Sequence, residues 1–173
     1  MPPSIGFPPV ARADARVLIL GTLPGAESLR QRQYYAKKQN SFWRIMGEIV
    51  NAPPEMPYKK RLACLTKNGI ALWDVCASAE RKGSLDSNIK AERLNDFELF
   101  FKKHKKITLI CFNGQPAAKK FRRFVWPQLS GRNFDFCILP STSPAYAGMR
   151  YERKLARWRK ALRKAVKANA KKI

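Results

Sequence analysis

The sequence predicts an α/β fold in which helices cover both faces of a parallel sheet. Four short apolar runs have the length and composition of buried strands, at residues 16–20, 69–75, 107–112 and 134–139. Helix-like segments separate these runs, and strands that alternate with helices pair in parallel. Because 173 residues are enough for one ordinary core, we expect a single domain over residues 1–173.

The expected helices lie between the strands and after the last one. The first four span residues 41–50, 58–67, 92–104 and 115–126, and the last runs from about Tyr151 to Ala168. Apolar residues recur at helical spacing in this last segment, at Leu155, Trp158, Leu162 and Val166. An extended, Pro-rich arm at residues 1–13 precedes the first strand, and a basic tail at 169–173 follows the last helix.

The charge of the chain indicates a polyanionic partner. Lys and Arg number 35 against 12 acids, which gives a formal net charge of +23. Such a surplus destabilises a compact chain by self-repulsion, and binding to nucleic acid is the usual reason to keep it. A hydrophobic content of 45% excludes a disordered chain. A membrane surface is a weaker alternative, because only the basic C-terminal helix is amphipathic in the required way.

Cysteine and histidine usage predicts neither a metal site nor a cofactor. The four cysteines are Cys64, Cys76, Cys111 and Cys137, and no two have the spacing of a zinc or iron–sulfur site. His104 is the one histidine and lies in the solvated run KKHKK, so no Ser-His-Asp or Cys-His arrangement is possible. Reduced thiols and the lack of a signal-peptide pattern indicate a protein of the cytoplasm, associated with the nucleoid, or of the nucleus, and not a secreted protein. We also expect a monomer.

Polar, turn-forming loops follow all four predicted strands. In an open parallel sheet the carboxyl ends of the strands lie on one edge, and ligands bind there. The first loop, GTLPGAES at residues 21–28, has two glycines that let a phosphate or a base approach the backbone closely, or that simply form a tight turn. It lacks the pattern of a P-loop or of a dinucleotide fingerprint.

The segment QYYAKKQNSFWRI at residues 33–45 combines aromatic rings, cations and one amide. Asn40 or Ser41 is a natural N-cap for the following helix, and Phe42 has the pattern of a core residue. Tyr34 and Tyr35 lie in a basic, loop-like stretch in which burial is less expected. Exposed rings among cations suit base stacking, which contributes roughly 1–3 kcal/mol per base.

Two later loops offer further polar groups. Asn113 ends the third strand, where it is either a turn residue or a fixed amide that reads the edge of a nucleobase. Residues 140–145, PSTSPA, form either a rigid turn or a clamp on phosphates. Asp74 and Asp86 are the acids best placed for the crevice, although each has the alternative of capping a turn or pairing with a nearby cation.

Taken in chain order, these segments resemble the uracil-DNA glycosylase superfamily. The resemblance rests on GTLPG at 21–25, the stretch from Tyr35 to Trp43, Asn113-Gly114, and Pro140 to Ala145. The motifs LPG, YYA…NSFW, GSLDSNI, FNG and PSTSPA are most similar to the hypoxanthine-DNA glycosylase branch. The ordered set covers nearly the whole chain and is far more specific than any one motif.

The resemblance implies an α/β/α sandwich around a four-stranded parallel sheet, and a monofunctional enzyme that flips a damaged base and hydrolyses its N-glycosidic bond. It implies that Asn40 orients the attacking water and that Asn113 contacts the base edge. The expected substrate contacts are Gly21, Thr22, Leu23, Pro24, Gly25, Tyr35 and Phe42. The expected DNA contacts are Ser28, Ser141, Thr142, Ser143, Tyr146, Met149 and Arg150, with Tyr146 or Met149 filling the gap in the duplex.

Two features depart from the superfamily pattern. Leu23 stands where many relatives carry the Asp or Asn that positions water, so we assign the catalytic role to Asn40. The second motif lacks the histidine that some relatives direct at the leaving base. Tyr146 also stands where members of the branch often have a small polar residue.

The resulting hypothesis is a DNA glycosylase for deaminated bases, with hypoxanthine favoured over uracil and with double- or single-stranded DNA as the partner. The alternative is a nucleic-acid-binding module of the same fold, in which catalysis is lost at Leu23 or directed at another lesion. A hydrolase of free nucleosides is a weaker third hypothesis, because a small substrate does not require a charge of +23.

Overall fold

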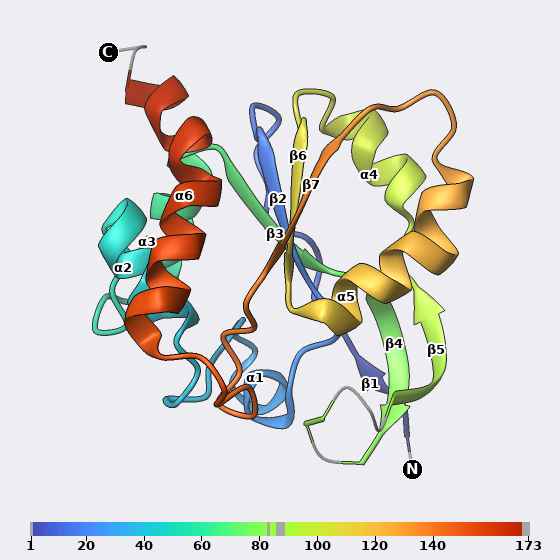
Figure 1. Ribbon diagram of the computed structural model, residues 1–173. Coiled ribbons are helices and arrows are strands. Elements are labelled where there is room, and N and C mark those ends of the chain that lie inside the picture. Colours follow the sequence, from blue (N-terminus) through green and yellow to red (C-terminus); the bar gives the residue numbers. More distant parts are fainter. Residues whose placement is uncertain (1, 83, 86–88, 171–173) are drawn as a thin grey trace.

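A four-stranded parallel sheet forms the centre of the computed structural model, which describes residues 2–82, 84–85 and 89–170 (Figure 1). The strand order is β3-β2-β6-β7. Every neighbouring pair is parallel, and the strands span Ile70–Asp74, Val17–Gly21, Leu109–Asn113 and Asp135–Leu139. The predicted fold class, an α/β/α sandwich on a four-stranded parallel sheet, is confirmed.

Helices cover both faces of this sheet, because its strands carry apolar residues on both sides (Figure 1). In β2, Leu18 and Leu20 belong to one core and Val17 and Ile19 to the other. The second core lies under three helices: α2 (Phe42–Val50), α3 (Tyr58–Lys67) and α6 (Tyr151–Ala170). The first lies under α4 (Phe97–Lys103) and α5 (Gln115–Lys120), which continues through η2 (Phe121–Val125) and η3 (Trp126–Gln128).

A second, antiparallel sheet was not predicted. Its order is β1-β4-β5, with β1 at Ser4–Ile5, β4 at Cys76–Arg81 and β5 at Ile89–Leu94. The expected helix over 92–104 is wrong in its first part, because strand β5 continues to Leu94. Helix α4 begins at Phe97, and Asp96 caps it by accepting a hydrogen bond from Leu99 N at 2.9 Å. The β4–β5 pairing shifts register twice, so the regular alternation that marks a strand in sequence is lost.

The carboxyl ends of the parallel strands lie at one edge, near the short helix α1 (Ala26–Gln31), which was also not predicted (Figure 1). Strand β2 ends at Gly21, β3 at Asp74 and β6 at Asn113. In the described part of the chain, no helix is both long enough and apolar enough to cross a membrane.

Helix α6 is held to the sheet by its predicted apolar face. Leu155, Trp158, Leu162 and Val166 all pack into the core under α2 and α3. Trp158 is fully buried, and its Nε1 donates a hydrogen bond to the Pro140 carbonyl oxygen at 3.0 Å. Its ring meets Phe42 edge to face, with centroids 6.0 Å apart. Trp158 therefore joins α6, α2 and the loop after β7.

Replacing Trp158 by Ala should lower the free energy of unfolding by about 3–5 kcal/mol, because the change removes a buried ring and leaves a cavity. Urea denaturation measures this loss. Arg159→Ala is the matched control on the same helix, since Arg159 forms only an exposed ion pair with Glu48 at 3.4 Å and should change stability by less than ~1 kcal/mol. Equal effects of the two substitutions would contradict the anchoring role of Trp158.

Candidate active site

A cavity of about 530 Å³ opens where the central strands end. This volume lies within the range of roughly 300–1,000 Å³ that is typical of small-molecule sites. Most of the predicted site residues line it, from four separate segments of the chain: Gly21, Thr22, Leu23, Pro24, Gly25, Ser28, Tyr35, Asn40, Asn113, Ser141, Thr142, Ser143 and Tyr146. Phe42, Met149 and Arg150 do not line it.

Thr142 connects three of these segments. Its backbone N–H donates to Asn113 Oδ1 at 2.9 Å, and its Oγ1 accepts from Asn113 Nδ2, also at 2.9 Å. Its carbonyl oxygen accepts from the backbone N–H of Ser41 at 3.0 Å and from the Ser41 hydroxyl at 3.3 Å. Through these bonds Thr142 holds the loops together, and only 1% of it is exposed. Its expected DNA contact stays a prediction.

The amide of Asn113 is fixed by this pairing. One N–H and one lone pair of the side chain are used by Thr142, and an amide carries two N–H donors and two acceptor lone pairs. One donor and one acceptor site therefore remain for a ligand. Gly114 follows at φ +96°, and a Cβ there would lie 3.1 Å from Ser141 Cβ, so the glycine lets the two loops approach each other.

Asn40 has the capping contact that its position predicts, and it also lines the cavity. Its Oδ1 accepts a hydrogen bond from Phe42 N, at the first residue of α2, at 3.0 Å. Ser41 stands at the N-cap position without a side-chain capping bond. The contact with Phe42 uses one lone pair of the Asn40 amide and leaves its two N–H donors for other partners.

Tyr35 is held in an unusual backbone conformation. Its φ is +55°, which is uncommon for a bulky residue and costs on the order of 1–3 kcal/mol. The ring stacks on Phe42, with centroids 4.0 Å apart and an interplanar angle of 24°. Phe42 is fully buried behind it, so the expected substrate contact by Phe42 is corrected to a support for Tyr35.

Tyr34 is also a core residue, against the expectation of an exposed ring. Its hydroxyl donates to the Pro8 carbonyl oxygen at 3.2 Å, and its carbonyl oxygen accepts from Trp43 Nε1 at 2.8 Å. Burial raises the pKa of the Tyr34 phenol, with smaller contributions from Asp74 and two neighbouring tyrosines. Of the two adjacent tyrosines, only Tyr35 has the half-buried position that suits contact with a ligand.

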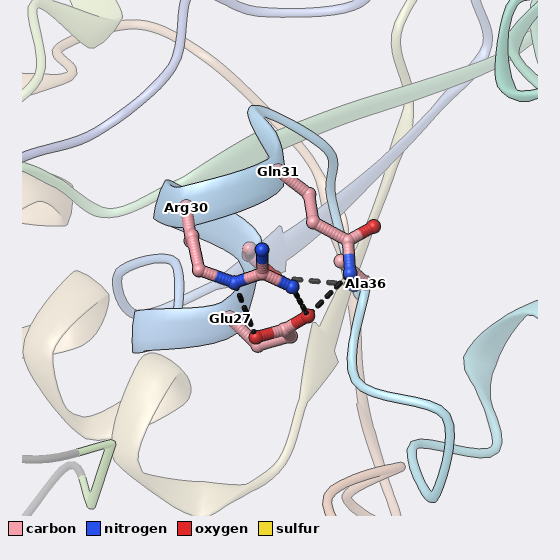
Figure 2. Close-up of polar contacts among 5 residues, drawn as sticks. Glu27, Arg30, Gln31 and Ala36 are labelled. Carbon is pink, nitrogen blue, oxygen red and sulfur yellow. Dashed lines mark hydrogen bonds and ion pairs between the residues drawn. The ribbon is translucent and has the colours of Figure 1, made fainter.

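Helix α1 contributes Glu27 and Ser28 to the lining of the cavity. Figure 2 shows the polar contacts of Glu27 on this helix. Glu27 accepts hydrogen bonds from Arg30 and Gln31, and these lower the pKa of its carboxyl group to about 2. The buried Ser28 hydroxyl accepts from the backbone N–H of Ala36 at 3.1 Å. Ser28 thus fixes the loop that carries Tyr35, and its expected phosphate contact stays a prediction.

The loop after β7 is shaped by its own hydroxyl groups. Ser141 Oγ accepts from Ser143 N, and Ser143 Oγ accepts from Ala145 N, each at 3.2 Å. Tyr146 is 43% exposed at the end of this series, and its carbonyl oxygen accepts from Lys154 Nζ at 2.8 Å. Burial lowers the pKa of Lys154.

The sequence shows to which protein family the chain with this cavity belongs. The model of the uracil DNA glycosylase superfamily matches residues 8–167. The chain belongs to the uracil DNA glycosylase superfamily. Two similar proteins are named hypoxanthine DNA glycosylase, from Methanosarcina acetivorans and Methanosarcina barkeri. They are 41% and 37% identical to this chain over 141 residues, which is 81% of this chain and 86% of each relative.

The fold comparison agrees with the sequence comparison. A solution NMR structure of a protein named as a candidate uracil DNA glycosylase, also from Methanosarcina acetivorans, superimposes with a TM-score of 0.80. The two chains are 36% identical, and the match covers 94% of this chain and 98% of the other.

Leu23 has a structural role, because it packs against the second sheet. Its side chain is buried in a small apolar cluster with Cys76 and Ala79 of β4. The loop after β2 is thereby held against the second sheet. An apolar side chain offers no group that could hold a water molecule, so another residue of the cavity has to supply that group.

Several cavity residues were not selected from the sequence. Lys37 and Arg157 bring positive charge to the lining, and Ser84 Oγ accepts from Ala26 N at 3.0 Å. Asp74 was noted among the acids but not chosen, whereas Asp86 lies outside the described residues. The sequence did not distinguish Arg157 from the many other cations on α6, so its place at the cavity could not be predicted. Within the described ranges, no group of three or more His, Cys, Asp or Glu residues is placed to hold a metal ion.

Replacing Thr142 by Val should lower the free energy of unfolding by about 1–2 kcal/mol, since the Asn113 N–H loses its acceptor in a partly buried site. Chemical denaturation measures the change. Thr142→Ser is the matched control, because it keeps the hydroxyl and should retain most of the stability. A serine variant as unstable as the valine variant would show that the methyl group matters and the hydrogen bond does not.

Proposed function

We propose that this protein is a monofunctional DNA glycosylase that flips a deaminated base out of DNA and hydrolyses its N-glycosidic bond, with hypoxanthine as the favoured base and uracil as the alternative. The observation that carries the proposal is the cavity of about 530 Å³, which an aromatic ring and two amides from two segments of the chain line and which has room for an extruded base. The names of the two Methanosarcina relatives support hypoxanthine. One chain supplies all these groups, which supports an enzyme that acts as a monomer.

Base flipping costs a few kcal/mol, and least at a mismatch. Tyr35 offsets much of this cost if the extruded base stacks on its ring, because stacking contributes roughly 1–3 kcal/mol per base. Phe42 supports the ring from behind, so the stacking surface is already in place before DNA binds. The remaining donor and acceptor of Asn113 then contact the base edge.

Hydrolysis requires a water molecule in line with the anomeric carbon. Asn40 is an amide and cannot take a proton as a base does, so its contribution is to hold that water in position, which removes part of the entropic barrier. As the bond breaks, negative charge develops on the departing base. Asn113 and the backbone N–H groups of the 21–25 loop are the donors that stabilise this charge.

DNA binding rests on positive charge around the cavity mouth. Lys37 and Arg157 line the cavity and supply phosphate contacts, in addition to the net charge of +23. Ser141 and Ser143 contact the flanking phosphates, and Arg150 extends this surface. Tyr146, which is exposed, or the neighbouring Met149 fills the gap that the flipped base leaves.

A binding module of the same fold is the second candidate, because Leu23 stands where many superfamily members carry the acid or amide that positions water. Strand cleavage by hot alkali, after incubation of duplexes that contain deoxyinosine or deoxyuridine, distinguishes the two. The proposal predicts incision at deoxyinosine. No incision at any deaminated base, with the protein in excess, would favour the binding module.

Replacing Asn40 by Ala or by Ser should reduce excision by roughly 100-fold, because the water is no longer held in line. Serine is the matched control for the capping contact, since it is also a good N-cap and should keep the stability near that of the wild type. Single-turnover excision and affinity for a product-like duplex are measured for both variants. An active serine variant would show that Asn40 acts only as a cap.

Affinity for undamaged duplex should fall steeply with salt. If about four phosphates are neutralised, the slope of log K against log salt is near −3.6, or roughly 100-fold between 50 and 200 mM. Fluorescence anisotropy gives the slope. Lys37→Ala and Arg157→Ala should each reduce it by about 1.

Lys102→Ala is the control for that measurement, because Lys102 is paired with Glu98 at 2.7 Å on α4, away from the cavity. It should leave the slope unchanged. A flat salt response of the wild type would contradict an interface dominated by phosphate contacts.

A further inference from the structure

Asp74 is a buried carboxylate at the cavity, and the mechanism above does not use it. It is the last residue of β3, lines the cavity and is only 4% exposed. Its backbone is fixed from two sides, because it pairs with Gly21 in the sheet and its carbonyl oxygen accepts from Asn95 Nδ2 at 2.8 Å. The carboxylate therefore extends from a rigid strand end and not from a loose loop.

Gly21 makes room for this carboxylate beside Tyr35. A Cβ added to Gly21 would lie 2.5 Å from Asp74 Oδ1 and 3.2 Å from the Tyr35 hydroxyl oxygen. The Asp74 carboxylate and the Tyr35 hydroxyl thus approach the same point of the β2 backbone. Any side chain at position 21 would displace one of them, which explains why glycine ends this strand.

The strand order places Asp74 and Asn113 on opposite sides of Gly21. Strand β2 lies between β3 and β6, so the backbones of the outer two are separated by roughly 9–10 Å. A base that lies over the end of β2 has the Asn113 amide on one side and the Asp74 carboxylate on the other. The edges of one base can then be contacted by two residues of different chemistry.

A carboxylate differs from an amide in that it only accepts hydrogen bonds. It has about four lone-pair sites, so Asp74 can keep partners within the protein and still accept from a ligand. Deamination changes the ring nitrogen of the Watson–Crick edge from an acceptor to a donor. Adenine presents a lone pair at N1 and hypoxanthine an N–H, and cytosine and uracil differ in the same way at N3.

A carboxylate at this edge therefore favours the deaminated base and repels its parent. With adenine in the pocket, two acceptors would face each other in a buried site, and buried polar groups without suitable partners reject a ligand strongly. Among the described cavity residues the other acid is Glu27, whose carboxylate is bonded to Arg30 and Gln31 at the exposed rim. The cations of the lining are Lys37 and Arg157.

We propose that Asp74 is a specificity-determining residue, which accepts a hydrogen bond from the ring N–H that deamination creates. The assignment rests on the proposed function of this cavity. It adds a second contact to the base edge, one that responds to the chemical change that defines the lesion.

The test compares two bases in the same duplex, hypoxanthine and 1-methylhypoxanthine, in which a methyl group replaces the N–H. Single-turnover excision is measured for the wild type, Asp74→Ala and the isosteric Asp74→Asn. The wild type should prefer hypoxanthine. Asp74→Ala should excise hypoxanthine roughly 10- to 100-fold more slowly than the wild type, which is the effect expected for a lost hydrogen bond to a charged group. It should excise the methylated base as fast as the wild type does, because the smaller side chain leaves space for the methyl group. Asp74→Asn should slow the excision of hypoxanthine less than Asp74→Ala, because its amide oxygen is still an acceptor, although a neutral one.

Affinity for a duplex with a tetrahydrofuran abasic site is the folding control, and all three proteins should bind it alike because it presents no base. If both bases are excised more slowly by the same factor in the folded variants, Asp74 does not contact the ring N–H and the assignment is overturned. A wild type that leaves deoxyinosine intact would instead overturn the proposed function, and this assignment with it.

Discussion

The hydrogen bonds of Thr142 are the constraint on which the site depends. Three segments that are far apart in the chain meet at this one residue: the start of α2 through Ser41, the end of β6 through Asn113, and the loop after β7. The two proposed catalytic amides are thereby placed relative to each other, since Asn40 precedes Ser41 directly. Both amides also have part of their hydrogen-bonding capacity used by the fold, which fixes their orientation before any ligand arrives.

The other half of the cavity is organised by close packing. The left-handed backbone of Tyr35 is unfavourable in isolation, and it persists because the ring stacks on Phe42, which in turn meets Trp158 of α6. The stability of the α6 core thus maintains a strained residue at the site. Because Gly21 has no side chain, the Asp74 carboxylate and the Tyr35 hydroxyl can both lie against the end of β2.

The sequence predicted the central sheet well, because its four strands are continuous apolar runs between polar loops. It did not predict β4 and β5, whose pairing is broken by two register shifts, or α1, whose six residues follow a Leu-Pro-Gly turn that dominates the local pattern. Within the site, the polar residues at strand ends could be located from topology alone. The burial of Ser28, Phe42 and Thr142 could not, because it depends on which loops pack against each other in three dimensions.

The protein combines a rigid, largely preformed pocket with a strongly basic chain, and we propose that one extruded base occupies that pocket. The most direct measurement is a crystal structure with a duplex that contains 2′-fluoro-2′-deoxyinosine, in which the N-glycosidic bond resists hydrolysis. We expect the hypoxanthine ring to lie outside the duplex, stacked on Tyr35 and within about 3 Å of the Asn113 side chain. A base that remains stacked in the duplex, or that is held on another face of the protein, would contradict it.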